Sequence, residues 1–600
     1  MAIAEVKLRS EMDSSLQWNL GDLYQGYAAW EAALAEVQEM CGGFETYRGR
    51  LGESGGQLLA ALRAEDEIGR RLERIWAYGM FHHDQDTQDP QGTEMVAKAQ
   101  ATAAQAGEAT AFLVPELVAL PDGRLEELQR QTPDLAEYRH TLKEIERQRR
   151  HVLAPGEEAL LAAFSPVLGN ADTVAGQLSN ADLTFRDAET GSGDAMPLSH
   201  GRYGQYMESR DRHLRQSAYL NMHKAYEEHR HTFAATLDQQ MRTAVTAARV
   251  RHYGSALEAA LDGRNLPREL YYRLIDAVHA ALPSLHRYIA WRGRVLGVDR
   301  MHFYDIYPPL LDLPEQHYSW PEAQEMARAG LGPLGAHYLE GLSHILHDRY
   351  VDVYENRGKR SGAYSMDVYD VHPYILMSFT GTRDSVFTLV HEAGHSMHSI
   401  LSRENQTFRN AQYPIFLAEI ASTTNEHLLL QHLLRTSGDP LEQTDLRDDL
   451  AQKFLATVFR QTLFAEFELK AHERVEAGGA LTADFLQATY GDLLRLYYGP
   501  DLEIDEVGTF EWARIPHFYM GYYVFQYATG FIAAAALSQA ILKDGAPAAE
   551  RYLAFLGSGG SDDPLPILRR AGVDLMEVAT LTDGLESFTA VVDDLGKRGW

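Results

Sequence analysis

The sequence predicts a mostly α-helical protein with one small β-sheet, for three reasons. Apolar residues recur at three- and four-residue intervals along most of the 600 residues, which places them on one face of a helix. Strand-like runs are confined to a few places. Hydrophobic residues make up 45% and charged residues 23% of the chain, as is usual for a soluble globular protein with a large core.

The helical pattern covers seven segments in order along the chain. They are residues 27–40, 58–78, 92–120, 137–150, 213–251, 268–296 and 450–476. Between the fourth and the fifth, residues 183–198 predict a β-hairpin whose turn, DAETGSGDAM, is rich in Gly and Asp. This change in composition is the best candidate for a domain boundary. We therefore expect an N-terminal helical region, 1–195, and a second region, 196–600.

The remaining strand signal, residues 350–379, leads into another helix. The apolar run 374–379 predicts a strand, and the Thr-Gly-Thr sequence after it predicts a turn. Asp384 or Ser385 is the expected N-cap of the helix that follows. The small sheet is thus expected to lie directly before this helix.

His391, Glu392 and His395 form a His-Glu-x-x-His motif on that helix. Residues four apart lie on one face, so both imidazoles can bind one metal ion while Glu392 points beside it toward a water molecule. Chance supplies this motif in about one of twelve chains of this size and composition, so the context must decide. The apolar residues of the expected helix occupy another face, which is consistent with a metal site.

Glu419 is the expected third metal ligand, because a catalytic zinc is usually held by three side chains and keeps one position for water. It lies in a second apolar helical segment, 414–426, which has Pro at its first turn. A carboxylate between Leu417 and Ile420 is costly unless a cation compensates it. Two histidines and one carboxylate suit Zn²⁺ best, although cobalt and manganese stay open.

Two further residues near the motif have open roles. Glu426, two turns after Glu419, can accept a hydrogen bond from the outer N–H of a ligating histidine, or it is simply solvated. His398 is a conceivable alternative to Glu419, but three ligands on one helix rarely complete a tetrahedron with an open position. We expect His398 to pack near the site.

The segments HEAGHSMHS and AEIASTTNE resemble the oligoendopeptidase F branch of the thimet-oligopeptidase family of zinc metallopeptidases. The resemblance extends to GKRSGAYS and HPYILMSF upstream and to WARIPHFYMGYYVFQYATG downstream. It also includes WNLGDLY near the N-terminus and SRDRHLRQSAY in the centre, and so covers nearly the whole chain. It implies one Zn²⁺ held by His391, His395 and Glu419, with Glu392 as the general base.

The family resemblance also implies an architecture and a substrate class. It implies a two-lobed helical metallopeptidase with a small β-sheet beside the zinc helix and an internal substrate channel, in which 196–600 is the catalytic region. Such a channel admits short unfolded peptides and excludes folded proteins. The expected activity is hydrolysis of internal peptide bonds in short oligopeptides.

His517 and Tyr522 are similar to the family's pair that contacts the substrate and the tetrahedral intermediate. Hydrogen-bond donors aimed at the developing oxyanion lower the barrier to hydrolysis. More distant members have tyrosines where this chain has Gln526 and Thr529. Tyr527 is therefore expected only as a substrate contact.

The segment GKRSGAYS supplies the other expected substrate contacts, Gly362, Ala363 and Tyr364. Glycine allows close backbone approach, and a strand edge beside the site can bind an extended peptide through main-chain hydrogen bonds. The alternative is an ordinary turn. The spacing matches neither glycine-rich phosphate-binding motif.

Charge and cysteine content limit the expected binding partners and the expected cellular location. The net charge of −30 argues against nucleic acid as a partner. The single cysteine, Cys41, cannot form an intramolecular disulfide, and residues 1–17 carry charges where a signal peptide needs an apolar core, so we expect a cytoplasmic location. Polar residues interrupt the apolar stretch 522–542, which predicts a buried helix rather than a membrane span. The oligomeric state is left open.

Two other functions are compatible with the motif. A zinc exopeptidase, either a metallocarboxypeptidase or a dipeptidase, needs a fixed basic group for the terminal carboxylate of the substrate, and the sequence identifies none beyond guesses such as Lys359 or Arg360. A peptide-binding protein that has lost catalysis is the second alternative. The preferred side chains around the scissile bond and the substrate length stay open.

Overall fold

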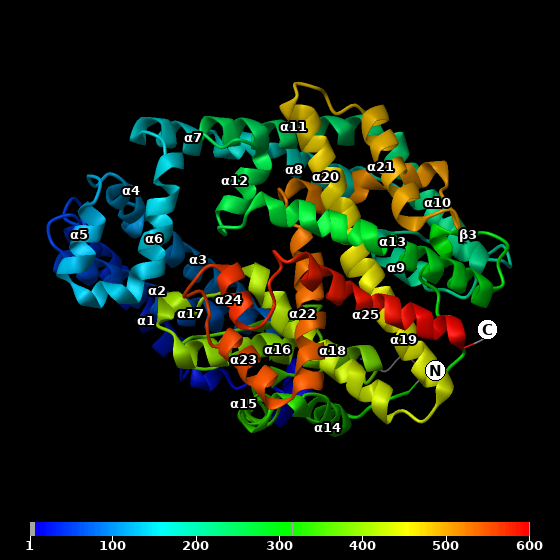
Figure 1. Cartoon of the computed structure of the whole chain (residues 1–600). Helices are drawn as coiled ribbons and strands as arrows, with labels where there is room; N and C mark the ends of the chain where they lie inside the picture. Colours follow the sequence, from blue (N-terminus) through cyan, green and yellow to red (C-terminus); the bar gives the residue numbers. More distant parts are fainter. Residues whose placement is uncertain (1–5, 315, 599–600) are drawn as a thin grey trace. The chain divides into compact units, whose positions relative to one another are not determined.

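The computed structural model describes residues 6–314 and 316–598, and helices dominate it, as the sequence predicts (Figure 1). The chain divides into two compact units, each built from three segments. Unit 1 comprises Met1–Val152, Glu315–His432 and Leu537–Gly572, and unit 2 comprises Leu153–Pro314, Leu433–Ala536 and Val573–Trp600. The expected boundary at residue 195 lies within unit 2 and stays a prediction.

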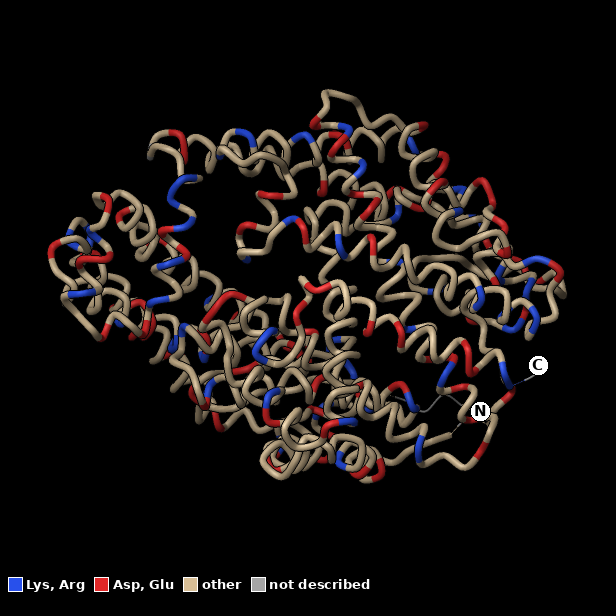
Figure 2. The backbone as a smooth tube through the Cα atoms, viewed as in Figure 1, with Lys and Arg blue, Asp and Glu red and all other residues tan. Residues whose placement is uncertain are grey.

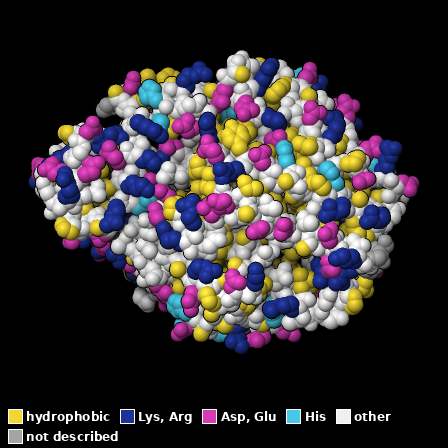
Figure 3. All heavy atoms as spheres, in the orientation of Figure 1, with side chains coloured by type: hydrophobic (Ala, Val, Ile, Leu, Met, Phe, Trp, Pro, Cys, Tyr) yellow, Lys and Arg dark blue, Asp and Glu magenta, His cyan; other side chains and the backbone are white. Residues whose placement is uncertain are grey.

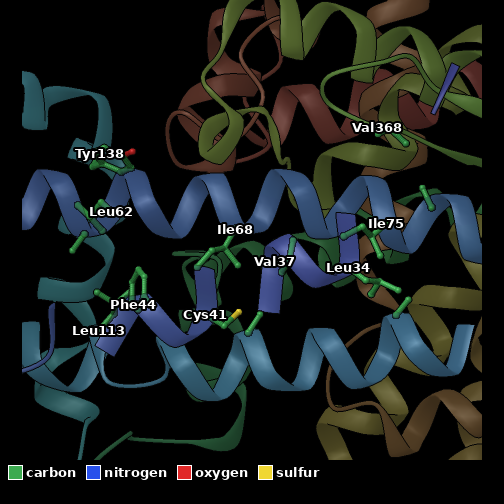
Figure 4. Packing of buried hydrophobic residues seen from close by; sticks show 14 of the residues in the cluster. Leu34, Val37, Cys41, Phe44, Leu62, Ile68, Ile75, Leu113, Tyr138 and Val368 are labelled. Carbon is green, nitrogen blue, oxygen red and sulfur yellow. The ribbon is translucent and has the colours of Figure 1, made fainter. Parts of the chain in front are cut away.

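The N-terminal part of unit 1 is a helical layer. Its helices are α1 (Tyr27–Phe44), α2 (Gly55–Gln85), α3 (Pro90–Thr110), α4 (Leu113–Val118), α5 (Arg124–Gln131) and α6 (Arg139–Gln148). The first three pack against one another, and Figure 4 shows Leu34 and Val37 of α1 and Ile75 of α2 in the shared core. The segment 92–120, predicted as one helix, is two, because the chain turns at Ala111 and Phe112.

The rest of unit 1 surrounds the motif helix. It contains α14 (Trp320–Gly330), α15 (Ala336–His347), α16 (Arg383–Asn405), α17 (Phe408–Ala411), α18 (Ile415–Thr436), α23 (Ala546–Leu556) and α24 (Pro564–Arg570). Helix α18 continues for four residues past this unit's second segment. Because α16 carries the His-Glu-x-x-His motif and packs on α14, α15 and α23, its two histidines lie on a helix that is packed on several sides within unit 1.

A three-stranded sheet precedes α16, as predicted. Strand β6 (Tyr374–Leu376) lies in the middle, parallel to β4 (Val351–Asp352) and antiparallel to β5 (Tyr364–Met366). All three residues of β6 are buried. The predicted N-cap is wrong by at least two residues: the Thr382 side chain accepts the Ser385 N–H at 3.2 Å, because the chain already turns at Gly381 (φ +81°).

Unit 2 is also helical. It contains α7 (Pro155–Leu168), α8 (Asn170–Gln177), α9 (His200–Met207), α10 (Arg212–Glu228), α11 (Arg230–Val250), α12 (Ala256–Asp262), α13 (Arg268–Leu296), α19 (Pro440–Phe454), α20 (Arg460–Glu476), α21 (Ala483–Tyr498) and α25 (Val578–Lys597). Two segments predicted as single helices are broken: 213–251 at His229, and 450–476 by a π-helical turn at Leu455–Phe459. Periodicity detects neither break, because the apolar pattern continues across it.

Short strands complete unit 2. The predicted hairpin is confirmed as β1 (Ala188–Glu189) paired antiparallel with β2 (Ala195–Met196). Strands β3 (Met301–His302) and β7 (Leu502–Glu503) form a parallel pair that the sequence did not predict. Two-residue strands bury too few alternating side chains to leave a periodic signal.

Helix α22 (Phe525–Asp544) runs from the end of the second segment of unit 2 into unit 1. Among the described residues it is the one continuous helix with the length and composition to cross a membrane, and 72% of its most apolar window is buried. Burial of this kind is typical of a core helix. Lys and Arg are interspersed with Asp and Glu along the chain in Figure 2, and Figure 3 shows both signs interspersed on one face.

Candidate metal centre and neighbouring residues

Helices α16 and α18 bring the three expected metal ligands together. His391 Nε2 and His395 Nε2 lie 3.6 Å and 3.8 Å from Glu419 Oε2, and the three ligand atoms all lie within 4.8 Å of one another. Zinc ligands at 2.0–2.1 Å in a tetrahedron are about 3.4 Å apart. Two imidazole nitrogens and one carboxylate at this spacing therefore fit a zinc ion and leave one position open.

A glycine in the motif sets the distance between the two helices. A Cβ at Gly394 would lie 2.6 Å from the Ser422 Cα, so only glycine lets α16 and α18 cross this closely. The Ser422 hydroxyl also donates to Glu419 Oε2 at 3.1 Å, which orients the third ligand. Gly394 thus lets the two helices approach closely enough for Glu419 to reach the two histidines.

Glu426 orients the first histidine. Its Oε1 lies 2.7 Å from His391 Nδ1, and a proton on Nδ1 leaves Nε2 free to bind a metal. Burial lowers the pKa of His391, but the Glu426 hydrogen bond and charge outweigh it and raise that pKa. Burial lowers the pKa of His395 to about 3, so His395 is neutral, as a metal ligand must be.

Replacement of Glu426 is expected to weaken zinc binding. Loss of a carboxylate behind a ligating histidine typically costs 10–100-fold in metal affinity, so we expect Glu426→Ala to raise the zinc Kd by about that factor. Glu426→Gln keeps an acceptor oxygen and is expected to have a smaller effect. Zinc titration of both variants measures this, and excess zinc should restore much of the activity. An unchanged Kd in Glu426→Ala would contradict the orienting role.

Glu392 lies beside the ligands on α16 and is only 6% exposed. Burial raises its pKa to about 7, and among the described residues no donor binds its Oε2. A carboxylate with a pKa near neutrality can both accept and return a proton. The burial of Glu392 and its unpartnered Oε2 are therefore consistent with a general base.

Strand β5 places the expected substrate contacts beside α16, the helix that carries Glu392. The strand lies at the edge of its sheet and packs on α16, where Ser365 Oγ and Ser396 Oγ are 2.8 Å apart. Tyr364 opens this strand and donates its hydroxyl to Asp84 at 3.0 Å. Gly362 precedes it with φ +93° and is exposed, and Ala363 is half-buried. These three residues lie together at the sheet edge, and their role stays a prediction.

His398 lies outside the ligand cluster. Its ring is fully buried and stacks on Tyr413 at 3.6 Å with Phe555 nearby at 5.6 Å. Burial lowers the pKa of His398 to about 3. The residue thus packs beside α16 as an uncharged aromatic side chain.

His517 and Tyr527 belong to unit 2 and lie near each other there. The His517 ring, in the 3₁₀ helix Pro516–Tyr519, is 6.1 Å from the Tyr527 ring and 6.2 Å from the Tyr523 ring. Burial lowers the pKa of His517, which keeps it neutral. Sequence reasoning missed Tyr523, because adjacent tyrosines in a loop carry no signal for which one faces the histidine.

Tyr522 has a different environment from Tyr523. It is 2% exposed, packs on Tyr271 at 5.5 Å and stacks with His472 at 4.5 Å. Its backbone lies in the left-handed region (φ +51°), and its N–H donates to Glu468 Oε1 at 2.6 Å. In this conformation the Tyr522 ring lies inside unit 2. A role as oxyanion donor stays a prediction and requires the ring to leave this position.

Glu468 makes the stability of this loop depend on pH. Burial raises its pKa to about 8, and the Tyr522 N–H lowers it only in part. This value exceeds the pKa of an unfolded glutamate, about 4.3, so the folded state favours the protonated form of Glu468. The contribution of Glu468 to the free energy of unfolding is therefore complete at acidic pH and is lost as the pH rises through 8. Glu468→Gln removes the charge, so we expect a flatter melting-temperature profile between about pH 5 and pH 9. Parallel profiles for the variant and the unmodified protein would contradict this.

A second group of potential metal ligands lies in unit 1. His140, Glu144 and Asp563 place their ligand atoms within 4.8 Å of one another. Lys143 Nζ lies 2.8 Å from Asp563 Oδ2, and Arg147 lies 2.6 Å from Glu144 Oε2. Because each carboxylate already has a cationic partner, this group is an ion-pair network.

Comparisons with known proteins give a consistent result. The model of peptidase family M3 matches residues 205–587, and an oligopeptidase F model matches residues 116–185. The chain is 40% identical to oligopeptidase PepF of Bacillus subtilis over 98% of this chain and 88% of that protein. It is 39% identical to group B oligopeptidase PepB of Streptococcus agalactiae, over 94% of each chain.

A solved structure supports the same relationship. The crystal structure of oligoendopeptidase-F from Enterococcus faecium superimposes with a TM-score of 0.74 at 36% identity. The match covers 94% of this chain and 98% of that one. Similarity therefore extends over the fold as well as the motif.

Proposed function

The chain belongs to peptidase family M3 and is a metalloendopeptidase of the oligoendopeptidase F type, and we propose that it cleaves short peptides with one zinc ion and Glu392 as the general base. The observation that carries this proposal is the cluster of His391, His395 and Glu419 ligand atoms, with Glu392 on the same helix as two of them. We also propose that the protein is two-lobed with an internal substrate channel, and that it is cytoplasmic.

In the proposed mechanism the metal and Glu392 have different roles. When bound, zinc supplies Lewis-acid polarisation of the scissile carbonyl and makes water more acidic. Glu392 takes the proton from the attacking water at its carboxylate and returns it to the departing amine. Its burial favours this role, because a carboxylate shielded from bulk water binds a proton more readily than an exposed one.

The chain's other residues hold and orient the reactants. Glu426 fixes the His391 ring, and Ser422 fixes Glu419. We assign peptide binding to the edge strand β5, where an extended substrate can add main-chain hydrogen bonds beside Gly362 and Ala363. His517 is the proposed oxyanion donor of unit 2.

The tyrosine that assists His517 can be identified by removing single hydroxyl groups. Loss of one oxyanion donor typically lowers kcat by about 10²–10³-fold. Because the Tyr523 ring lies near His517 and the Tyr522 ring is buried, we expect Tyr523→Phe to lower kcat by about 10²-fold and Tyr522→Phe by less. Steady-state kinetics at saturating zinc measure both. The reverse order would assign the hydroxyl to Tyr522 and imply that its ring leaves the interior.

The exopeptidase alternative has weak support, because both of its candidate anchors are already engaged. Lys359 is fully buried, and its Nζ lies 2.7 Å from Asp352 and 2.6 Å from the Met377 carbonyl oxygen. Arg360 Nη1 lies 2.9 Å from Asp84 Oδ2. Lys359 is therefore not available for a terminal carboxylate of a substrate, and Arg360, whose side chain is 54% exposed, would have to leave Asp84 to bind one.

Two measurements test the proposed function. An end-blocked, internally quenched peptide should be cleaved, and a chelator should abolish cleavage until zinc is restored. Mass spectrometry of a peptide library of graded length should find internal cuts only below a length limit. Cleavage confined to free termini would favour an exopeptidase, and rapid cleavage of a folded protein would contradict the restriction to short peptides.

A further inference from the structure

Two cavities in unit 2 share one wall. Their volumes are about 340 Å³ and 300 Å³, and His200 and Arg514 line both of them. Volumes of this size are at the lower end of the range for small-molecule sites. The shared wall is therefore the place at which one ligand can contact both cavities.

The first cavity has aromatic walls and two carboxylates, of which the buried one, Glu511, is already neutralised. Tyr203, Tyr219, Phe303 and Tyr307 supply the rings. Glu511 accepts hydrogen bonds from Arg460 Nη2 at 2.7 Å and from the Tyr490 hydroxyl at 2.8 Å. Burial raises the pKa of Glu511, but the charge of Arg460 outweighs it and holds that pKa well below its usual range. Arg460 and Glu511 thus form a balanced pair.

Arg514 is the cation left over from this balance. Its guanidinium lies over the Tyr203 ring at 4.6 Å and 3.6 Å from Glu511 Oε1, beyond hydrogen-bonding distance. Among the described residues no oxygen accepts a hydrogen bond from Arg514, and its side chain is 26% exposed. The planar guanidinium presents paired N–H donors that match a carboxylate. Glu208 also lines this cavity but is exposed, so water screens its charge.

We infer that Arg514 binds the C-terminal carboxylate of an oligopeptide, with the last apolar side chain in the aromatic cavity. The inference rests on the proposed function for its ligand class. Arg514 differs from Lys359 and Arg360, which are paired with Asp352 and Asp84. The contact would favour substrates with a free C-terminus without limiting cleavage to the terminal bonds, so it is compatible with the proposed endopeptidase activity. An intact substrate and a released product can both end in a free carboxylate beside an apolar side chain, so either can be the ligand.

The position of Arg514 in the chain connects this site to the proposed catalytic loop. The second cavity is lined by Ala513, Arg514, Ile515, Pro516 and Tyr519, the segment that includes His517. A carboxylate bound at Arg514 therefore restrains the backbone that carries His517. This contact favours peptides whose C-terminus is free.

The test compares one octapeptide with an apolar last residue in two forms, as the free acid and as the C-terminal amide. For the zinc-loaded enzyme we expect kcat/KM to be about tenfold or more higher for the acid than for the amide, mainly because KM is lower for the acid. A charge-assisted hydrogen bond changes a binding constant by at least about tenfold. Arg514→Gln should reduce the ratio to about one. Arg514→Lys keeps the charge and should retain part of the ratio.

Controls separate the outcomes. Arg495→Gln changes an exposed arginine of α21 paired with Asp492 and should leave the acid-to-amide ratio as in the unmodified enzyme. Calorimetry with the product peptide, as acid and as amide, measures whether a released product binds at Arg514. This measurement does not depend on turnover. Equal kinetics and equal binding of acid and amide would overturn the inference while endopeptidase activity stands. A preference that persists in Arg514→Gln would overturn it too, whereas absence of all cleavage would contradict the proposed function.

Discussion

Glu392→Gln is expected to lower kcat by at least about 10²-fold while the protein still binds one zinc ion. The change keeps the size of the side chain and removes the group that takes the proton from water. Glu392 lies outside the cluster of potential ligand atoms, which consists of His391, His395 and Glu419. Metal content and kcat, measured on the same preparation, therefore separate catalysis from metal binding.

A matched control is available on the same helix. Glu404 lies near the end of α16 with a side chain that is 46% exposed, and Glu404→Gln should leave both metal content and kcat close to normal. Near-normal turnover in purified Glu392→Gln would refute its assignment as the general base. Loss of zinc from that variant would instead indicate a structural role.

Glu419→Ala is expected to abolish stable zinc binding and, with it, activity. Even a residue behind a ligand contributes about 10–100-fold to metal affinity, so loss of one of three direct ligands should cost more than about 100-fold. Zinc should raise the melting temperature of the unmodified protein, because a ligand that binds only the folded state stabilises it. The variant should show no such rise at the same zinc concentration.

The effect of Glu419→Ala can be distinguished from misfolding. Without zinc, the variant and the unmodified protein should melt at similar temperatures, since the Glu419 side chain is one-third exposed. Stoichiometric zinc in dialysed Glu419→Ala would falsify the ligand set. His398, which stacks on Tyr413, would then be the first residue to reconsider.

Local features of the fold were predictable because their causes are local. The three- and four-residue repeat identifies helices such as α1 and α13, and the glycine-rich turn identifies the β1–β2 hairpin. Breaks inside long patterns were not predictable, as at His229, because the apolar face continues through them. The β3–β7 pair joins residues far apart in sequence, so no local pattern could reveal it.

Some features of the candidate site were likewise predictable from the sequence, and others were not. The spacing of His391 and His395 placed both on one helical face, and a costly carboxylate in an apolar helix pointed to Glu419. Orientation in the loop after His517 did not follow from sequence. The backbone at Tyr522 is left-handed, which buries that ring and leaves Tyr523 beside the histidine.

The sequence by itself indicated the helical class and the candidate metal ligands, because both depend on residue type and short-range spacing, and its motifs indicated the family. Only the tertiary structure decided which charged groups are free to act. It paired Lys359 with Asp352 and Arg460 with Glu511, and it left the donors of Arg514 facing two cavities. The physical reason is that charge balance in a folded interior depends on contacts between distant segments.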